Sequence, residues 1–323
     1  MEEKYKAIKE EKLKYYSLSK YTCYEILMES QIASAGAHQA RLIEKFKKNK
    51  NYIKTQFLAL KIAFSFLFLV LPIIPLFVFI EINEYLAAGT YMINTLFFIS
   101  SLALTLYLGL TILYSLMFGM ISTSSFMSGN SFKWLQTLPF SKKNLKKIGI
   151  MTIFRNLDIP LIVLMAGFPI IMLIITQNFL IFLVSLLVSF LNVIFSFSIL
   201  IIVGEKLSYL FSESKTGSKR ANLVRILTML GYFIIMFTSS FIFSLGIGAV
   251  ENLFERFATT EPNIFLIIIL GLIPYPFAPS YLISLSTIPG SLQWGLILSS
   301  LTGFALFILI VWSLFKYAQR KLH

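Results

Sequence analysis

The feature that most restricts the fold of this sequence is a series of long apolar runs with almost no charge. About 20 such residues are needed for a helix to cross the ~30 Å hydrocarbon core of a bilayer, where a helix satisfies its own backbone hydrogen bonds. The chain is 57% hydrophobic, whereas soluble domains are typically about 45–50% apolar. We therefore predict an all-α polytopic membrane protein. Its six transmembrane helices are expected at residues 57–80, 91–121, 148–175, 178–203, 224–250 and 292–315.

Proline and lysine modify the first of these spans. Pro72 and Pro75 lie in its second half and predict a kink there, because proline removes a backbone donor and crowds the preceding turn. Lys61 lies near its start, where we expect the ammonium group to reach the headgroups.

Residues 263–290 follow a different pattern. The apolar stretch 264–273 would form ~15 Å of helix, about half the hydrocarbon core. It is followed by Pro274, Pro276 and Pro279 and by a second short apolar stretch, so the helix must break at the prolines. This predicts a re-entrant helical hairpin, which enters and leaves the membrane on one side, between the fifth and sixth spans.

Charge is distributed unevenly over the segments between the apolar runs. Of the 28 Lys and Arg residues, 25 lie in segments that share one side if the N-terminus is cytoplasmic, and the segments on the other side hold Arg256 and five Glu. This positive-inside bias places both termini in the cytoplasm and explains the net charge of +13 without nucleic acid. The basic segments are 1–56, 124–150, 204–225 and 316–323.

The same pattern divides the chain into a cytoplasmic N-terminal region (1–56), a membrane domain (57–315) and a basic cytoplasmic tail (316–323). Apolar residues recur in the N-terminal region at helical spacing, next to a cluster of lysines. The amphipathic helix that this predicts either lies on an anionic membrane surface or packs against a partner or the bundle itself. The apolar residues are Tyr21, Tyr24, Met28, Ile32, Ala35, Leu42 and Phe46; the lysines are Lys45, Lys47, Lys48 and Lys50.

Catalytic motifs are missing from the sequence. It contains no G-x-x-x-x-G-K-[ST] nucleotide-binding loop, and its histidines, His38 and His323, lie outside the predicted spans, so an intramembrane H-E-x-x-H metalloprotease is excluded. No base accompanies the serines of the spans, as a serine nucleophile would require. Ser115 and Gly119 are expected to form a helix-packing face. We expect no enzyme activity, metal or cofactor in this chain.

Arg155 and Asp158 are charged residues within the third predicted span. They lie three residues apart and so share one face of a helix. Charges in a membrane segment are costly and are usually paired or functional. Because both lie in the first third of the span, we expect a structural pair rather than a translocation or proton-coupling site.

The link between the second and third spans contains WLQTLPFSKKNLKK at residues 134–147. Phe132, Leu135 and Leu138 recur at three-residue steps and predict one apolar edge of a short helix, which Pro139 ends. Ser141 is then expected to cap the next helix. The lysines that follow it oppose the helix dipole, which indicates a role in orientation or partner binding. They are Lys142, Lys143, Lys146 and Lys147.

The turn Thr137-Leu138-Pro139-Phe140-Ser141-Lys142-Lys143 resembles the leucine-proline-aliphatic-serine-basic turn of permease subunits of type-2 ATP-binding-cassette exporters. Phe140 replaces the usual Ile or Val, and no acidic residue lies between Ser124 and Ser141, where many relatives carry one. The family's surface helix, six spans, re-entrant helices and basic tail are similar to the organisation predicted here along essentially the whole chain.

This resemblance implies a permease in the cell membrane that pairs with a second permease subunit, identical or different. Separate ATPase subunits would bind ATP and Mg²⁺ and push on residues 131–147 and on the N-terminal surface helix. The implied coupling residues are Phe132, Trp134, Leu135, Leu138, Pro139, Phe140, Ser141, Lys142 and Lys143. The implied gate residues in the re-entrant hairpin are Pro274, Tyr275, Pro276, Phe277 and Pro279.

Two other classes of function are open on the sequence. A secondary transporter or channel would need ionisable groups near the middle of the membrane, and only Asp158 comes close. A non-transporting membrane scaffold would need neither the hairpin nor a coupling segment.

Overall fold

The computed structural model consists of α-helices joined by short turns, with no strand in the part of the chain that it describes. Five helices among the described residues are long and apolar enough to cross a membrane. The protein is therefore an all-α polytopic membrane protein, as the apolar runs predicted. The described residues are 15–28, 39–89, 92–128, 137, 140–212, 237, 248, 252, 255, 262–288 and 293–321.

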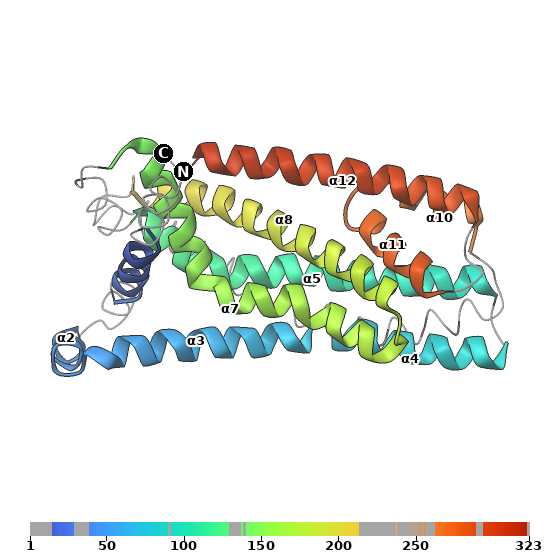
Figure 1. The fold of residues 1–323 in the computed structure, drawn as a ribbon, viewed down its shortest axis with the longest axis horizontal. Helices are drawn as coiled ribbons and strands as arrows, with labels where there is room; N and C mark the ends of the chain where they lie inside the picture. Colours follow the sequence, from blue (N-terminus) through green and yellow to red (C-terminus); the bar gives the residue numbers. More distant parts are fainter. Residues whose placement is uncertain are drawn as a thin grey trace, which may run out of the picture.

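The long helices lie side by side in a bundle (Figure 1). Each covers most of one predicted apolar run, so five of the six runs are confirmed as helical. The remaining run, 224–250, which is the fifth in chain order, lies outside the described residues except for two isolated positions. The helices are α3 (Lys50–Val70) with α4 (Ile73–Ala88), α5 (Ile93–Ser128), α7 (Lys142–Thr176), α8 (Phe179–Ser212) and α12 (Trp294–Lys321).

The first span is interrupted between α3 and α4, as its prolines predicted. The interruption lies at Leu71 and Pro72, because Pro72 cannot donate a helical hydrogen bond. Pro75 lies in the first turn of α4, where a missing N–H has no partner within the helix. The helix ends at Gly89, whose φ of 62° is the left-handed conformation that glycine adopts most readily.

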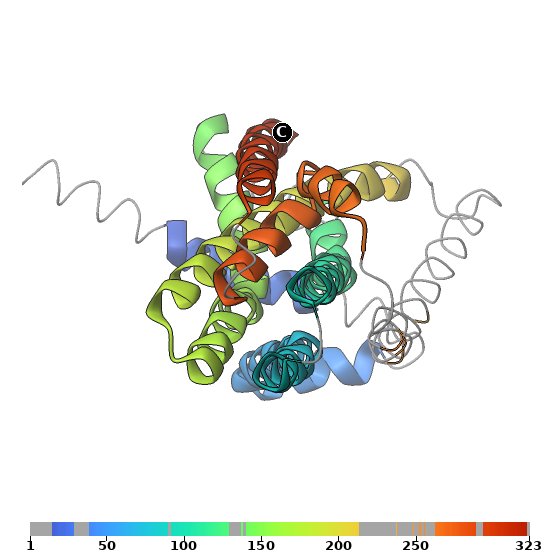
Figure 2. The same ribbon diagram turned by 90° about the vertical axis from the view of Figure 1, so that its right-hand side faces the viewer.

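Two short helices, α10 (Ile264–Gly271) and α11 (Phe277–Thr287), occupy the proline-rich segment. The predicted helix break is therefore confirmed. Both lie at the end of the bundle where α12 begins (Figure 1). Along the bundle axis, α11 lies among α12, α5 and α8 (Figure 2). Gly303 of α12 permits this arrangement, because an added Cβ would collide with the Gly271 carbonyl oxygen.

Small residues let α5 and α8 approach closely at the opposite end. A Cβ on Gly119 would collide with the Leu200 side chain, and a Cβ on Gly204 would collide with Thr123. Ser115, one turn before Gly119, is buried. The packing face predicted for Ser115 and Gly119 is confirmed, and it has the small-residue composition that brings membrane helices together.

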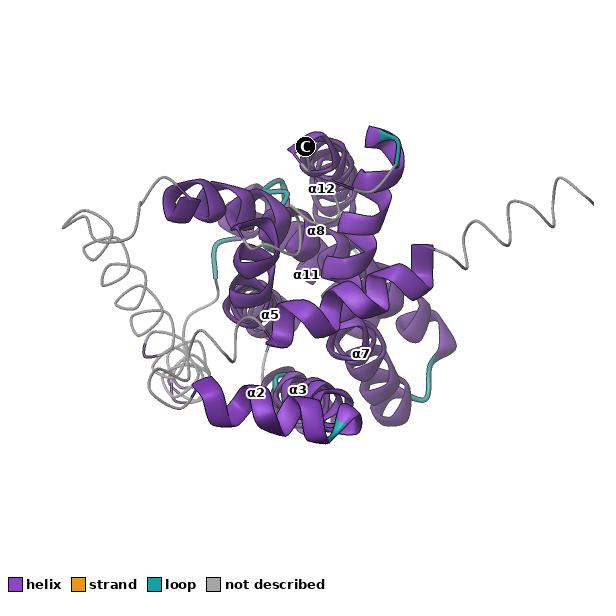
Figure 3. Ribbon diagram, turned by 90° about the vertical axis from the view of Figure 1, so that its left-hand side faces the viewer, coloured by secondary structure: helices purple, strands orange, loops and turns teal. Residues whose placement is uncertain are grey.

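The N-terminal region contributes two separate helices, at residues 15–28 and at α2 (Gln39–Lys48). Both lie at the end of the bundle where α7 begins and α12 ends (Figure 1). The 15–28 helix crosses the middle of that end, whereas α2 lies at its rim beside α3 (Figure 3). Ile32 and Ala35, predicted to belong to a single amphipathic stripe, lie outside the described residues.

Candidate functional site

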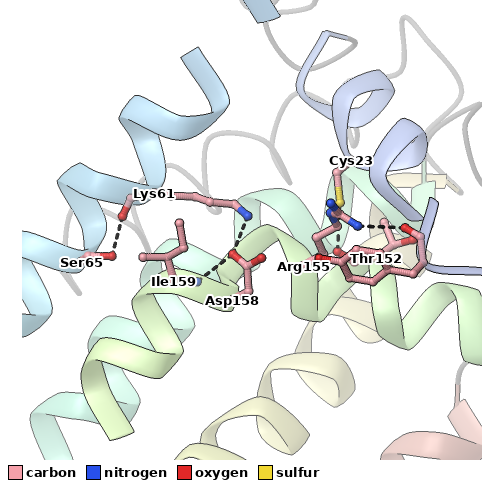
Figure 4. A network of polar contacts seen from close by, with 8 residues as sticks. Cys23, Lys61, Ser65, Thr152, Arg155, Asp158 and Ile159 are labelled. Atoms are coloured by element: carbon pink, nitrogen blue, oxygen red, sulfur yellow. Dashed lines mark hydrogen bonds and ion pairs between the residues drawn. The ribbon is translucent and has the colours of Figure 1, made fainter. Parts of the chain in front are cut away.

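The 15–28 helix is fastened to α7 by two contacts of its polar atoms (Figure 4). Arg155 Nη1 donates a hydrogen bond of 2.8 Å to the Tyr16 carbonyl oxygen, and its guanidinium group lies 4.0 Å from the centre of the Tyr16 ring. One turn earlier on α7, the Thr152 carbonyl oxygen accepts a hydrogen bond of 3.3 Å from Cys23 Sγ. The helix is thus held at two points along its length.

The same helix contacts α3 through aromatic and basic side chains. The Tyr24 ring meets the Phe57 ring edge to face, with centroids 5.5 Å apart. Lys61 Nζ lies 4.3 Å from the centre of the Phe57 ring and forms an ion pair with Asp158 of α7. Residues 15–28, α3 and α7 therefore share one packed junction.

The Lys61–Asp158 ion pair corrects two expectations from the sequence. Lys61 does not reach outward to headgroups: it is 6% exposed, and Ser65 Oγ donates to its carbonyl oxygen. Asp158 pairs with Lys61 rather than with Arg155, which faces the 15–28 helix (Figure 4). A buried charge needs a close partner. Along α7, Asp158 finds this partner on α3 and Arg155 finds it on the 15–28 helix.

The turn that precedes α7 meets the 15–28 helix. Ser141 caps α7, because its Oγ accepts a hydrogen bond of 3.3 Å from the Asn144 N–H; this predicted cap is confirmed. The Phe140 ring contacts the Tyr15 ring edge to face, with centroids 6.3 Å apart. Lys142 opens the helix, and Lys143 is exposed. The other predicted coupling residues, Phe132, Trp134, Leu135, Leu138 and Pro139, lie outside the described residues.

Cys23, the single cysteine, is buried on the side of the 15–28 helix that faces α7. Burial raises the pKa of its thiol from 9.0 to about 12, against the opposing effect of the nearby Lys61 and Arg155 charges. Since the thiolate is the reactive form of cysteine, the docked position makes Cys23 unreactive. Cys23 is therefore a structural contact in this state.

A second polar cluster lies at the break between α10 and α11. The Tyr275 hydroxyl donates a hydrogen bond of 2.6 Å to the Leu108 carbonyl oxygen of α5 and lies 3.2 Å from Asn192 Oδ1 of α8. Asn192 Nδ2 donates in turn to Thr111 Oγ1, at 2.6 Å. The side chain of Tyr275 thus joins three elements through one small polar cluster.

Aromatic rings hold Tyr275 in place. Its ring is stacked on Phe307 of α12, with centroids 5.4 Å apart, and lies 4.8 Å from the Phe195 ring of α8. Tyr275, one of the predicted gate residues, therefore reaches into the bundle rather than lying at the membrane–water interface. Pro274 and Pro276 flank it, Pro279 is buried in the first turn of α11, and Phe277 contacts the Tyr281 ring.

Hydroxyl groups fasten α11 to α5. Ser284 Oγ and Ser100 Oγ lie 2.9 Å apart, and Thr105 Oγ1 donates to Ser280 Oγ at 3.1 Å. Both contacts lie on the face of α11 that is turned toward α5, so the hairpin is anchored along its second helix as well as at Tyr275.

Sequence reasoning missed Lys61 and Asn192 as members of these clusters. A signal was available for Asn192, because it is an amide in the middle of a predicted span, where polar side chains usually face the bundle interior. Lys61 was assigned to the headgroups from its distance to the end of the span, and only the position of α7 reveals its partner.

Comparison with known proteins finds no family model that matches the chain and no similar curated protein or solved structure. Within the described ranges, no group of three or more His, Cys, Asp or Glu side chains could hold a metal ion.

Proposed function

We propose that this chain is the permease subunit of an ATP-driven exporter of the type-2 ATP-binding-cassette class. One observation carries the proposal: the 15–28 helix contacts the Phe140 turn, α7 and α3 together. A force applied to this helix from the basic end of the bundle would reach two membrane helices through packed contacts. Such rigid coupling is how a separate motor subunit can drive a membrane domain.

The membrane topology of the proposal has six spans, with 224–250 as the fifth. The lengths of α10 and α11 (8 and 11 residues) support a re-entrant hairpin, because helices of ~12 and ~16 Å fall well short of the ~30 Å core. The excess of basic residues at the end that holds residues 15–28, α2 and the end of α12 supports a cytoplasmic location for both termini. The cell membrane is the proposed location.

The hairpin is the proposed outer gate. Its tip holds together α5, α8 and α12 through Tyr275, so a shift of α7 or α8 would loosen the contacts of Asn192 and Phe195 with that ring. A second permease subunit completes the path for the transported substrate. ATP and Mg²⁺ are bound by the ATPase subunit.

Co-purification in detergent tests this proposal. An ATPase with a G-x-x-x-x-G-K-[ST] loop should co-purify with the chain, and replacing Trp134 and Leu138 with Glu should abolish its association or its permease-dependent ATP hydrolysis. A matched control places Glu at two exposed positions of the same end, Thr55 and Gln319, and should retain both. Absence of any such ATPase, or full coupled hydrolysis by the W134E/L138E variant, would refute the proposal.

The Lys61–Asp158 pair favours one alternative, a secondary transporter driven by an ion gradient. A largely buried carboxylate within a candidate span is the type of group that proton-coupled carriers use. This alternative requires transport into proteoliposomes under a pH or sodium gradient in the absence of ATP, and loss of that transport in Asp158→Asn. The exporter proposal requires ATP and a partner ATPase under the same conditions.

A further inference from the structure

α2 carries a row of exposed cations on one face. Arg41, Lys45 and Lys48 follow one another at four- and three-residue steps, which places them on the same side of the helix, and all three are exposed. The ion pairs found in the described part of the chain involve none of them. Glu44 is the single acidic residue of α2, so this face carries a net positive charge.

The junction with α3 holds α2 at a fixed angle. Phe46 is buried, and its ring lies 5.9 Å from that of Tyr52 on α3. At the one-residue link, the Asn49 N–H donates to the Lys45 carbonyl oxygen, and Asn49 Oδ1 accepts from the Asn51 N–H, both at 3.0 Å. The axis of α2 consequently lies across that of α3 (Figure 1), parallel to the surface of a membrane that α3 would cross.

The level of α2 matches the headgroup region of such a membrane. The exposed apolar surface of α3 begins at Leu58, which is 50% exposed. It follows the first residue of α3 by eight positions, or ~12 Å of helix. The headgroup zone adds roughly 5–8 Å to each side of the hydrocarbon core, and the long stems of Lys and Arg span the remainder.

We infer that α2 binds the headgroups of anionic phospholipids, in the leaflet at the basic end of the bundle. The positive charge of the Arg41, Lys45 and Lys48 face complements the negative charge of anionic headgroups. A lipid is favoured over a protein partner because α2 lies at the rim beside the apolar surface of α3, whereas the 15–28 helix covers the middle of that end (Figure 3). This inference does not depend on the proposed transport function.

Lipid titration of the purified full-length chain, followed by native mass spectrometry, tests the inference. The chain should prefer phosphatidylglycerol over phosphatidylcholine of the same acyl chains. The R41Q/K45Q/K48Q variant should lose about a hundredfold in affinity for phosphatidylglycerol, from the contribution of each basic residue near an anionic surface. The R41K/K45R/K48R variant should retain it.

The control removes the same charge from three exposed residues elsewhere at that end, Lys147, Lys206 and Arg320. The K147Q/K206Q/R320Q variant should bind phosphatidylglycerol like the unmodified chain, and unchanged melting temperatures would establish that both variants are folded. Equal phosphatidylglycerol binding by the R41Q/K45Q/K48Q and K147Q/K206Q/R320Q variants would overturn the inference. So would displacement of the lipid by equimolar inorganic phosphate, or loss of a co-purifying protein with unchanged lipid binding.

Discussion

Lys61 of α3 and Asp158 of α7, 97 residues apart in the sequence, form an ion pair at the junction of the two helices. Lys61 keeps 7% and Asp158 25% of its side chain exposed. Asp158 Oδ1 also accepts a hydrogen bond of 2.7 Å from the Ile159 N–H. The pair links the first and third apolar runs of the chain directly beneath the helix that we propose to receive the force of the ATPase.

Removing one member of this pair should destabilise the protein. Asp158→Leu leaves the Lys61 ammonium group buried without its counter-charge, which should cost about 3 kcal/mol, the low end for a buried pair because Asp158 is a quarter exposed. The double variant K61M/D158L should recover most of that loss, since neither charge remains. Chemical denaturation in detergent measures both changes.

The matched control is the pair of Lys321 and Glu205, whose side chains are 37% and 30% exposed. Lys321→Met should leave stability nearly unchanged, because exposed ion pairs contribute little. A D158L variant as stable as K321M would contradict the role assigned to the buried pair.

Cys23 should report whether the 15–28 helix is docked. Its pKa of about 12 keeps the thiol protonated between pH 8 and pH 10, where an ordinary cysteine with a pKa near 9 becomes mostly thiolate. Alkylation by N-ethylmaleimide should therefore be slow throughout this range, and stability that depends on the neutral thiol should decline only as the pH rises above 9 toward 12. A mass shift per chain measures the labelling.

Arg155→Gln should accelerate that labelling at least tenfold, because the hydrogen bond and the ring contact with Tyr16 that hold the helix are removed. Lys206→Gln, at an exposed position on α8, should leave the rate unchanged. Labelling of the unmodified protein as fast as in denaturant would show that the docked contacts do not persist in solution.

Tyr275→Phe should weaken the tip of the hairpin. It removes the hydroxyl that binds the Leu108 carbonyl oxygen and lies beside Asn192, at a cost of about 1–2 kcal/mol for a buried hydrogen bond. Tyr275→Ala also removes the stacking on Phe307 and should cost more. Thermal unfolding measures the loss of stability in each variant. Tyr21 is exposed, so Tyr21→Phe is a control that should not change stability. An equal loss of stability in Tyr21→Phe and Tyr275→Phe would contradict the role assigned to the Tyr275 hydroxyl.

Gly303→Ala should separate α12 from the end of α10. The new Cβ would meet both the Gly271 carbonyl oxygen and the Ala278 side chain, and overpacking of this kind costs about 1–3 kcal/mol. Gly109→Ala is the matched change on α5, with no atom within 4 Å of the new Cβ, and should be neutral or slightly stabilising. The free energies of unfolding of the two variants are measured in the same detergent. Similar free energies for Gly303→Ala and Gly109→Ala would refute the close contact at Gly303.

Local features of this chain were readable from its residues. The apolar runs predicted the long helices, because hydrophobic length is a property of a continuous segment. The interruption at Pro72, the break after residue 273 and the Ser141 cap were predicted for the same reason: each depends on the chemistry of a few adjacent residues. The division of the chain into basic and acidic connections was likewise visible in the order of its charges.

Contacts between distant residues were decided by the tertiary structure alone. The three-residue spacing of Arg155 and Asp158 suggested that they pair, yet the positions of α3 and the 15–28 helix give Asp158 to Lys61 and Arg155 to Tyr16. Tyr275 could have faced lipid or headgroups, and it reaches Leu108 because α11 packs among α5, α8 and α12. Hydrophobic length and proline act through neighbours in the chain, whereas the partner of a buried polar group depends on which helices the fold brings together.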